Sequence, residues 1–218
     1  MKKVRVGNFE IECSVCKNRA PFTRIMESDA SMAPDLDLRP SQPHRKTMMF
    51  WVTECPECGY CHGSVALPFS GERSYFESEE YKNCGGISAE NPLTVKFLKK
   101  ALVCMKNGEM IEAVQSYLYA AWTADDDKNE KLAADCRHAA IALIENNPES
   151  FKGNDNIAVL KADMLRRCGD FEQVISEYKG RRFSNPLFGV LCDFQVKLAL
   201  KKDSRVYTTD SIPGVKAR

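Results

Sequence analysis

The 218-residue sequence lacks any run of about 20 apolar residues, the length that a membrane-spanning helix needs. Its first residues also lack the long apolar stretch of a secretion signal, so we expect a cytoplasmic protein. No charge of one sign dominates, because 31 Lys and Arg stand against 30 Asp and Glu, for a formal net charge of +1. This balance gives no general support for nucleic acid or an anionic membrane as a partner.

Motifs that commonly mark an active site are missing as well. The sequence has no Gly-rich phosphate loop and no Ser-containing nucleophile elbow. None of the three histidines, His44, His62 and His138, has a nucleophile beside it in a familiar pattern. We find no positive indication of catalysis and lean towards a protein that is not an enzyme. The alternative is a hydrolase or other enzyme that uses Asp35, Asp37 or His62 between two layers of the fold.

What the sequence does contain is cysteine, with 10 residues of this type. In a reducing compartment, closely paired cysteines indicate a metal site rather than disulfides. Two Cys-x-x-Cys pairs stand 38 residues apart, in a spacing that a Pro-rich loop can close at little entropic cost. Four thiolates form a closed tetrahedral set for Zn²⁺ with no open position, which makes the ion structural. We therefore predict one structural zinc per chain, bound by Cys13, Cys16, Cys55 and Cys58.

Other interpretations of these cysteines exist. Cys61 or His62 could replace one of the four ligands. The string Cys58-Gly59-Tyr60-Cys61-His62 also matches a c-type haem attachment motif, but that attachment requires export. A redox dithiol is disfavoured because neither pair lies in a thioredoxin-like strand and helix context. The remaining cysteines read as small core residues: Cys84, Cys104, Cys136, Cys168 and Cys192.

Strand signals accompany both cysteine pairs. Residues 3–12 alternate partly between apolar and polar side chains and lead into the first pair. Residues 47–53 resemble a strand that leads into the second pair, and the Pro-rich segment 27–46 between them reads as loop. This layout predicts a zinc-ribbon-like β domain over residues 1–68. A linker over 69–92, rich in Gly and Pro, follows it.

Helical periodicity begins after the linker. Val95, Leu98, Leu102 and Met105 recur at three- and four-residue steps on one face, and Asn107-Gly108 ends that helix. We expect six helices over residues 93–202, followed by a flexible tail over 203–218. The fold class is then α+β, with the small β domain preceding an all-α domain. The five further helices are expected from Glu109, over 129–145, over 157–168, from Asp170, and over 187–201.

An internal repeat of 61 residues divides the helical part. Lys100-Ala101 matches Lys161-Ala162, and the same offset relates four further pairs of residues: Gly108 and Gly169, Met110 and Phe171, Ala113 and Val174, and Tyr117 and Tyr178. Each copy combines a helix, a glycine-containing turn and a second helix. This pattern resembles a tetratricopeptide helical hairpin, although the usual period is about 34 residues.

The chain as a whole, roughly residues 10–205, resembles a bacterial protein family, domain of unknown function 2225. The resemblance implies a zinc ribbon followed by tetratricopeptide-like helices, with no established activity. The segment 38–47 departs from the family pattern, which has Tyr and Asn-Pro there. The motifs that carry the resemblance are Cys13-Ser14-Val15-Cys16-Lys17-Asn18, Asp35-Leu36-Asp37, Val52-Thr53-Glu54-Cys55-Pro56-Glu57-Cys58-Gly59-Tyr60, Phe69-Ser70-Gly71-Glu72-Arg73 and Arg166-Arg167-Cys168-Gly169-Asp170-Phe171.

These features favour a zinc-binding protein-interaction module, a scaffold or adaptor whose helical hairpins bind a protein or peptide. No membrane partner is expected. The alternative is a zinc-ribbon protein that binds nucleic acid, because basic residues gather near the first cysteine pair. Residues 1–70 nevertheless carry 9 basic and 8 acidic side chains, which leaves no dominant positive footprint. The basic residues in question are Lys2, Lys3, Arg5, Lys17, Arg19 and Arg24.

Overall fold

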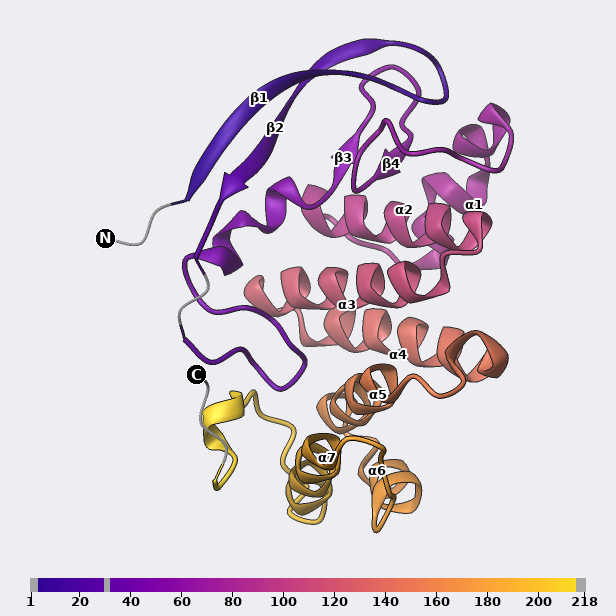
Figure 1. Cartoon of the computed structure of the whole chain (residues 1–218). Helices are drawn as coiled ribbons and strands as arrows, with labels where there is room; N and C mark the ends of the chain where they lie inside the picture. Colours follow the sequence, from indigo (N-terminus) through magenta and orange to yellow (C-terminus); the bar gives the residue numbers. More distant parts are fainter. Residues whose placement is uncertain (1–3, 30–31, 215–218) are drawn as a thin grey trace. The chain divides into compact units, whose positions relative to one another are not determined.

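The structure is a computed structural model that describes residues 4–29 and 32–214. It is an α+β fold, with short antiparallel sheets near the N-terminus and helices after them (Figure 1). The chain divides into two compact units, residues 1–29 with 43–136 and residues 30–42 with 137–218. Among the described residues, no helix combines the length and apolar character needed to cross a membrane.

The first unit contains two separate two-stranded antiparallel sheets and the hairpin of helices α2 and α3. The long sheet places Phe9 opposite Phe22, and the short one places Thr53 opposite His62. The elements are β1 (Arg5–Glu12), β2 (Arg19–Glu27), η1 (His44–Phe50), β3 (Thr53–Glu54), β4 (Cys61–His62), η2 (Arg73–Glu77), α1 (Glu79–Lys82), η3 (Cys84–Gly86), α2 (Pro92–Asn107), α3 (Met110–Asp126) and the first part of α4 (Glu130–Asn146).

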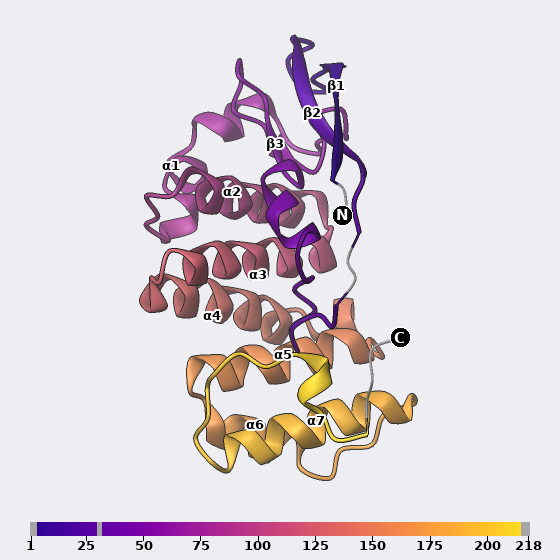
Figure 2. The ribbon, with the colours of Figure 1, turned by 90° about the vertical axis from the view of Figure 1, so that its left-hand side faces the viewer.

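The second unit is helical. Figures 1 and 2 both show α5 and α7 packed together, with α6 beside them. Residues 33–39 join this unit through an antiparallel bridge between Asp35 and Thr208. Its elements are the rest of α4, η4 (Pro148–Phe151), α5 (Asp155–Cys168), α6 (Phe171–Tyr178), α7 (Pro186–Ala199) and η5 (Thr209–Ser211).

The helix ends follow local sequence signals. The side chains of Asn91, Asn154 and Asn185 each accept a hydrogen bond from a backbone N–H in the first turn of α2, α5 and α7. Both α2 and α5 end at a glycine in the left-handed region, Gly108 at φ 78° and Gly169 at φ 88°. The helices expected from periodicity therefore lie within a few residues of their predicted bounds.

The strand expected over residues 47–53 is wrong in its larger part. Residues 44–50 form the 3₁₀ helix η1, and only Thr53–Glu54 is strand. The Thr47 hydroxyl donates to the His44 carbonyl at 2.7 Å and accepts from the Trp51 indole N–H at 3.0 Å. These local side-chain hydrogen bonds hold a tight turn that apolar patterning does not reveal.

The boundaries expected for the domains also differ from the observed units. The segment 69–92, expected as a linker, is packed around an aromatic cluster in which the Phe76 ring lies 4.8 Å from Phe69, 5.1 Å from Tyr81 and 5.5 Å from Tyr60, measured between centroids. Sheet and first helical hairpin thus share one core, because aromatic burial is a large stabilising term. The boundary between the units falls inside α4.

Residues 203–214, expected as part of a flexible tail, make specific contacts. The fully buried guanidinium of Arg166 donates to the carbonyl oxygens of Asp203 at 2.9 Å and Arg205 at 2.8 Å. Tyr207 accepts from the backbone N–H of Leu36 at 2.9 Å through its carbonyl. Residues 215–218 of the expected tail lie outside the described residues.

Candidate metal centre

The first cysteine pair forms a tight knuckle at the end of β1. The backbone N–H of Cys13 donates to the Asn18 carbonyl at 2.9 Å, and the N–H of Lys17 donates to the Cys13 carbonyl at 3.0 Å. Lys17 takes a left-handed conformation with φ 64°, which is uncommon for a residue with a side chain. Its ammonium donates to the Ser14 carbonyl at 2.9 Å and so holds the turn.

The second pair repeats this turn at the end of β3. The N–H of Cys55 donates to the Tyr60 carbonyl at 2.8 Å, and the N–H of Gly59 donates to the Cys55 carbonyl at 3.0 Å. Gly59 takes the left-handed conformation at φ 71°, in the place that Lys17 has in the first turn. The two knuckles therefore present their sulfur atoms with the same local geometry.

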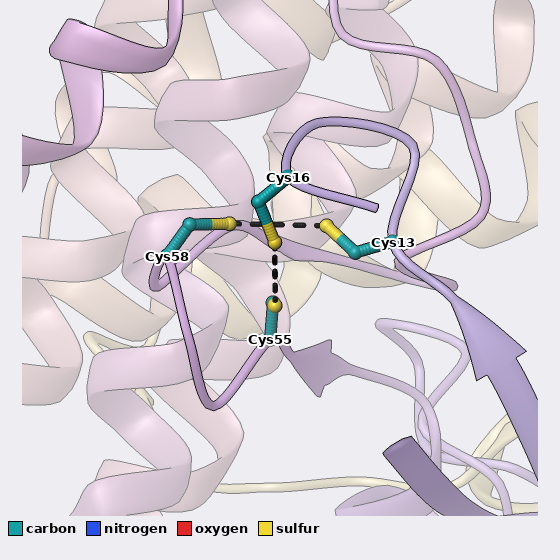
Figure 3. A group of neighbouring side chains, drawn as sticks. All are labelled: Cys13, Cys16, Cys55 and Cys58. Carbon is teal, nitrogen blue, oxygen red and sulfur yellow. Dashed lines mark hydrogen bonds between the residues drawn. The ribbon is translucent and has the colours of Figure 1, made fainter. Parts of the chain in front are cut away.

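The four sulfurs converge on one point. Figure 3 shows the two knuckles facing each other, with Cys13 opposite Cys58 and Cys16 opposite Cys55. The Sγ atoms are 3.8 Å apart in the first of these pairs and 3.5 Å apart in the second, and all four lie within 4.8 Å of one another. At a Zn–S bond of about 2.3 Å, the edge of a regular tetrahedron is about 3.8 Å long. The set therefore fits a single metal ion with four thiolate ligands.

The cysteines are not disulfides, because all ten are free thiols in the structure. Burial raises the pKa of Cys13 and of Cys58. Burial also opposes ionisation of Cys16, but hydrogen bonds to its sulfur from the backbone N–H of Asn18 and from the other three cysteines together lower its pKa. The protein alone thus favours the thiolate at Cys16 and disfavours it at Cys13 and Cys58, and a cation among the sulfurs would favour ionisation of these two.

Neighbouring side chains brace the knuckles. The Tyr81 hydroxyl, which belongs to α1, donates to the Gly59 carbonyl at 2.6 Å. The Tyr60 hydroxyl donates to the Leu67 carbonyl at 2.9 Å, and the backbone N–H of Ser14 donates to the Val65 carbonyl at 2.9 Å. Sequence patterning did not indicate that Tyr81 and Lys17 hold the knuckles in place. Placing the two knuckles in register, residue by residue, would have indicated Lys17 as the counterpart of Gly59.

The structure directs Cys61 and His62 away from the four sulfurs. The fully buried Cys61 thiol donates to the Lys96 carbonyl at 3.2 Å, and burial raises its pKa. His62 Nε2 lies 2.9 Å from Glu109 Oε2, and Cys104 Sγ lies 3.6 Å from the same nitrogen. These two residues of β4 connect the sheet to α2 and to the turn after it.

His62, Cys104 and Glu109 form a second group of potential ligands, but their hydrogen bonds do not suit a metal. The backbone N–H of Gly63 donates to His62 Nδ1 at 2.8 Å, which assigns the ring proton to Nε2. Nε2 then donates to Glu109 and offers no lone pair to an ion. Burial raises the Cys104 pKa to about 12, so that this group remains a thiol. We interpret this group as a structural link.

A third group joins His138, Cys168 and Asp170 in the second unit. His138 Nε2 lies 2.9 Å from Asp170 Oδ2, and both side chains are well exposed, at 52% and 37%. Burial raises the Cys168 pKa to about 12. An exposed pair beside a protonated thiol is a weak metal site.

Asp35 and Asp37, the other candidates for catalysis, belong to the second unit and are 6% and 2% exposed. Asp37 Oδ1 accepts from the backbone N–H of Arg39 at 3.2 Å. Among the described residues, no group of three or more potential ligands contains either aspartate, and His62 belongs to the first unit. Asp35 and Asp37 therefore do not share a unit with His62, the third candidate for catalysis.

Two of the described basic residues near the first knuckle pair with acids of the same hairpin. Arg19 pairs with Glu12 at 2.9 Å and Arg5 with Glu27 at 3.6 Å. The Arg24 guanidinium donates to the Ser64 hydroxyl. Lys2 and Lys3 lie outside the described residues. This internal neutralisation weakens the footprint that a nucleic-acid interface would need.

Comparison with protein-family models, curated proteins and solved structures finds no match to this chain. The four convergent sulfurs are therefore the observation from which function is argued.

Proposed function

We propose that this protein is a zinc-binding protein-interaction module in which a structural ion stabilises the first unit. The observation that carries the proposal is the convergence of four Sγ atoms from two matching knuckles. Soft thiolates in a tetrahedral set favour Zn²⁺. When bound, the ion supplies cross-linking of β1, β3 and their turns, and Cys13, Cys16, Cys55 and Cys58 would hold it.

A closed set of four ligands leaves no position for substrate, which supports a structural role rather than a catalytic one. Each of the two sheets has only two strands, so the first unit gains from a cross-link that can contribute on the order of 10 kcal/mol. We also propose membership of the family domain of unknown function 2225, supported by the sequence motifs quoted above.

An interaction role is supported by exposed apolar side chains on helix α7. Leu187 is 46% exposed and Val190 is 42% exposed. These two residues are three positions apart in the helix and thus lie on one face. Scattered apolar exposure is ordinary, so the pair serves as a testable contact rather than as evidence of a particular partner.

Metal analysis of the purified protein tests the zinc part. We expect about one zinc per chain in the wild type, loss of the ion in Cys55→Ser, and a lower unfolding temperature in that variant. Cys168→Ala, outside the four sulfurs, is the matched control and keeps its zinc. Full zinc content in Cys55→Ser would refute the ligand assignment.

Affinity capture tests the interaction part. A partner retained by the wild type and lost by Leu187→Lys/Val190→Lys, at unchanged zinc content, is the expected result. Failure of the wild type to capture any protein would contradict the interaction role without affecting the zinc assignment.

A further inference from the structure

A pocket of about 280 Å³ opens in the second unit between α4, η4, α5 and α6. At about 30 Å³ per water molecule, it has room for roughly nine waters, a volume that suits a ligand of amino-acid size. Its apolar wall includes Phe151 and Ile157, which are 7% and 3% exposed. The polar lining includes Lys161, Glu145, Glu177, Tyr178 and Arg181.

The internal repeat explains why this space exists. At an offset of 61 residues, Ala158 stands where the first helical hairpin has Phe97, whereas Gly180, the sequence counterpart of Tyr119, lies beyond the end of α6 and does not line the pocket. In the first hairpin, these two rings contact each other at 5.4 Å between centroids, and Phe97 is fully buried. Ala158 lines the pocket in the second hairpin. The second copy thus lacks, at the pocket, the aromatic side chain that Phe97 places in the core of the first.

The charged side chains that line the pocket carry more negative than positive charge around Lys161. Lys161 Nζ is held by Glu145 at 2.9 Å and by Glu177 at 2.8 Å, an arrangement with one negative charge in excess. The Lys161 contact lowers the pKa of Glu145, which keeps that carboxylate ionised near neutral pH. Asp155 adds a further negative charge, although its carboxylate accepts from the Ser184 hydroxyl and backbone N–H.

Two hydrogen-bond donors at the same pocket, on Tyr178 and Arg181, have no acceptor among the described residues. The Tyr178 hydroxyl is buried and has no hydrogen-bond partner among the described residues, and the whole residue is 1% exposed. A buried hydroxyl without a hydrogen bond costs free energy unless a ligand or water supplies an acceptor. Arg181 is exposed, its guanidinium lies 5.3 Å from the Tyr178 ring centroid and 5.2 Å from that of Phe183, and it forms no salt bridge within the described part of the chain.

We propose that this pocket binds a free aromatic α-amino acid. An aromatic side chain of the ligand would lie beside Ala158, where the first hairpin has the ring of Phe97. The ligand's carboxylate would accept from Arg181 and Tyr178, because guanidinium and carboxylate form strong charge-assisted hydrogen bonds. Its ammonium would offset the excess charge of Glu145 and Glu177. This site goes beyond the proposed function, since its residues belong to the second unit and not to the metal centre.

Calorimetric titration of the full-length, zinc-loaded protein with L-phenylalanine tests the proposal. We expect a dissociation constant on the order of 1 mM or tighter, since the ligand has few atoms. N-acetyl-L-phenylalanine, which lacks the positive charge, and L-phenylalaninamide, which lacks the negative one, should each bind at least about tenfold more weakly. Either analogue binding as tightly as L-phenylalanine would overturn the proposal. So would the absence of binding of L-phenylalanine at a concentration tenfold above the expected dissociation constant.

Variants locate the ligand. Ala158→Phe fills the pocket and should abolish binding, and Arg181→Gln should weaken it by about tenfold. Tyr178→Phe should weaken binding while leaving the free protein as stable as before, because it removes a hydroxyl that has no partner. Arg182→Gln, at a neighbouring exposed arginine that does not line the pocket, is the matched control and should bind normally.

Unchanged binding in both Arg181→Gln and Tyr178→Phe would place the ligand elsewhere and refute the site, whether or not Ala158→Phe folds. Zinc content should be the same in all four variants. Failure of this pocket and failure of the metal centre are therefore distinguishable in one set of proteins.

Discussion

The two helical hairpins, α2–α3 and α5–α6, use the same turn but stabilise it differently. In each, a left-handed glycine ends the first helix and an acidic residue follows, Glu109 or Asp170. In each, the acid pairs with a histidine at 2.9 Å. His62 is 5% exposed in the first pair, whereas His138 is 52% exposed in the second. The same local sequence signal thus becomes a core contact in one copy and a surface contact in the other.

Their interiors differ more strongly. The first hairpin has apolar Leu102 and Met105 where the second has Asp163 and Arg166. Arg166 Nη2 donates to Asp163 Oδ1 at 2.8 Å, and Gln195 Nε2 donates to the same oxygen at 2.9 Å. A repeat can therefore keep its backbone while one copy is held by apolar packing and the other by a buried polar network that also holds the C-terminal segment.

The largest loss of stability is expected when a polar core residue of the second hairpin is replaced by the apolar residue that the first hairpin has. Arg166→Met removes the ion-pair partner of Asp163, which keeps only the Gln195 N–H, and the donor to Gln195 Oε1 and two backbone carbonyls, which should lower the free energy of unfolding by about 3–5 kcal/mol. The double variant Asp163→Leu/Arg166→Met removes the stranded charge and should recover at least about 1 kcal/mol of that loss. Denaturant unfolding measures both. A double variant less stable than the single one would contradict a network centred on this ion pair.

The reverse conversion opens the first hairpin. Phe97→Ala places at this position the residue that the second hairpin has, and it should lower the free energy of unfolding by about 3–5 kcal/mol, because a fully buried ring leaves a cavity. Met49→Ala, at a side chain that is 59% exposed, is the control and should change stability by less than about 0.5 kcal/mol. A loss below about 1 kcal/mol in Phe97→Ala would show that the aromatic pair does not distinguish the hairpins.

The smallest difference in stability is expected from replacing Glu109 and Asp170, the acids that follow the turn glycines. Glu109→Ala leaves the buried His62 N–H without its acceptor and should lower the free energy of unfolding by about 1–3 kcal/mol at pH 7. Asp170→Ala breaks an exposed pair and should change it by less than about 1 kcal/mol. Equal losses in the two variants would remove the distinction between core and surface contact.

The Glu109 effect should depend on pH. Burial raises the pKa of Glu109, but the interaction with His62 and the hydrogen bonds from Cys104 and Asn107 together outweigh it, and the net pKa is lowered from 4.5. A depressed carboxyl pKa stabilises the fold above the unfolded pKa, and this contribution is lost as pH falls through the folded value. The difference between wild type and Glu109→Ala should therefore shrink below about pH 4.5 in denaturant unfolding. A difference that grows on acidification would have the wrong sign.

Sequence patterns predicted those elements and site residues whose signal lies in the adjacent sequence. Alternation indicated β1, and three- and four-residue steps with Asn-Gly or Cys-Gly endings indicated α2 and α5. The spacing of the four cysteines indicated the residues whose sulfurs converge. In each case the signal lies within a few residues of the feature that it predicts.

Patterning failed where distant contacts decide. Strand β2 was not anticipated, and Pro21 within it disguises the alternation. The expected strand over 47–53 yielded to the hydrogen bonds of Thr47. The segment after Asp203 read as flexible because the guanidinium that holds it, Arg166, lies 37 residues earlier in the chain. The pocket beside Ala158 could be recognised only from the sequence repeat together with the packing of the helices around it.

The central claim is that a single zinc ion binds four cysteine thiolates from two matching knuckles. X-ray absorption at the zinc edge of the purified protein tests it most directly. We predict a first shell of four sulfur atoms at about 2.3 Å. A shell that contains nitrogen or oxygen, or fewer than four sulfurs, would contradict the assignment of Cys13, Cys16, Cys55 and Cys58 as the complete ligand set.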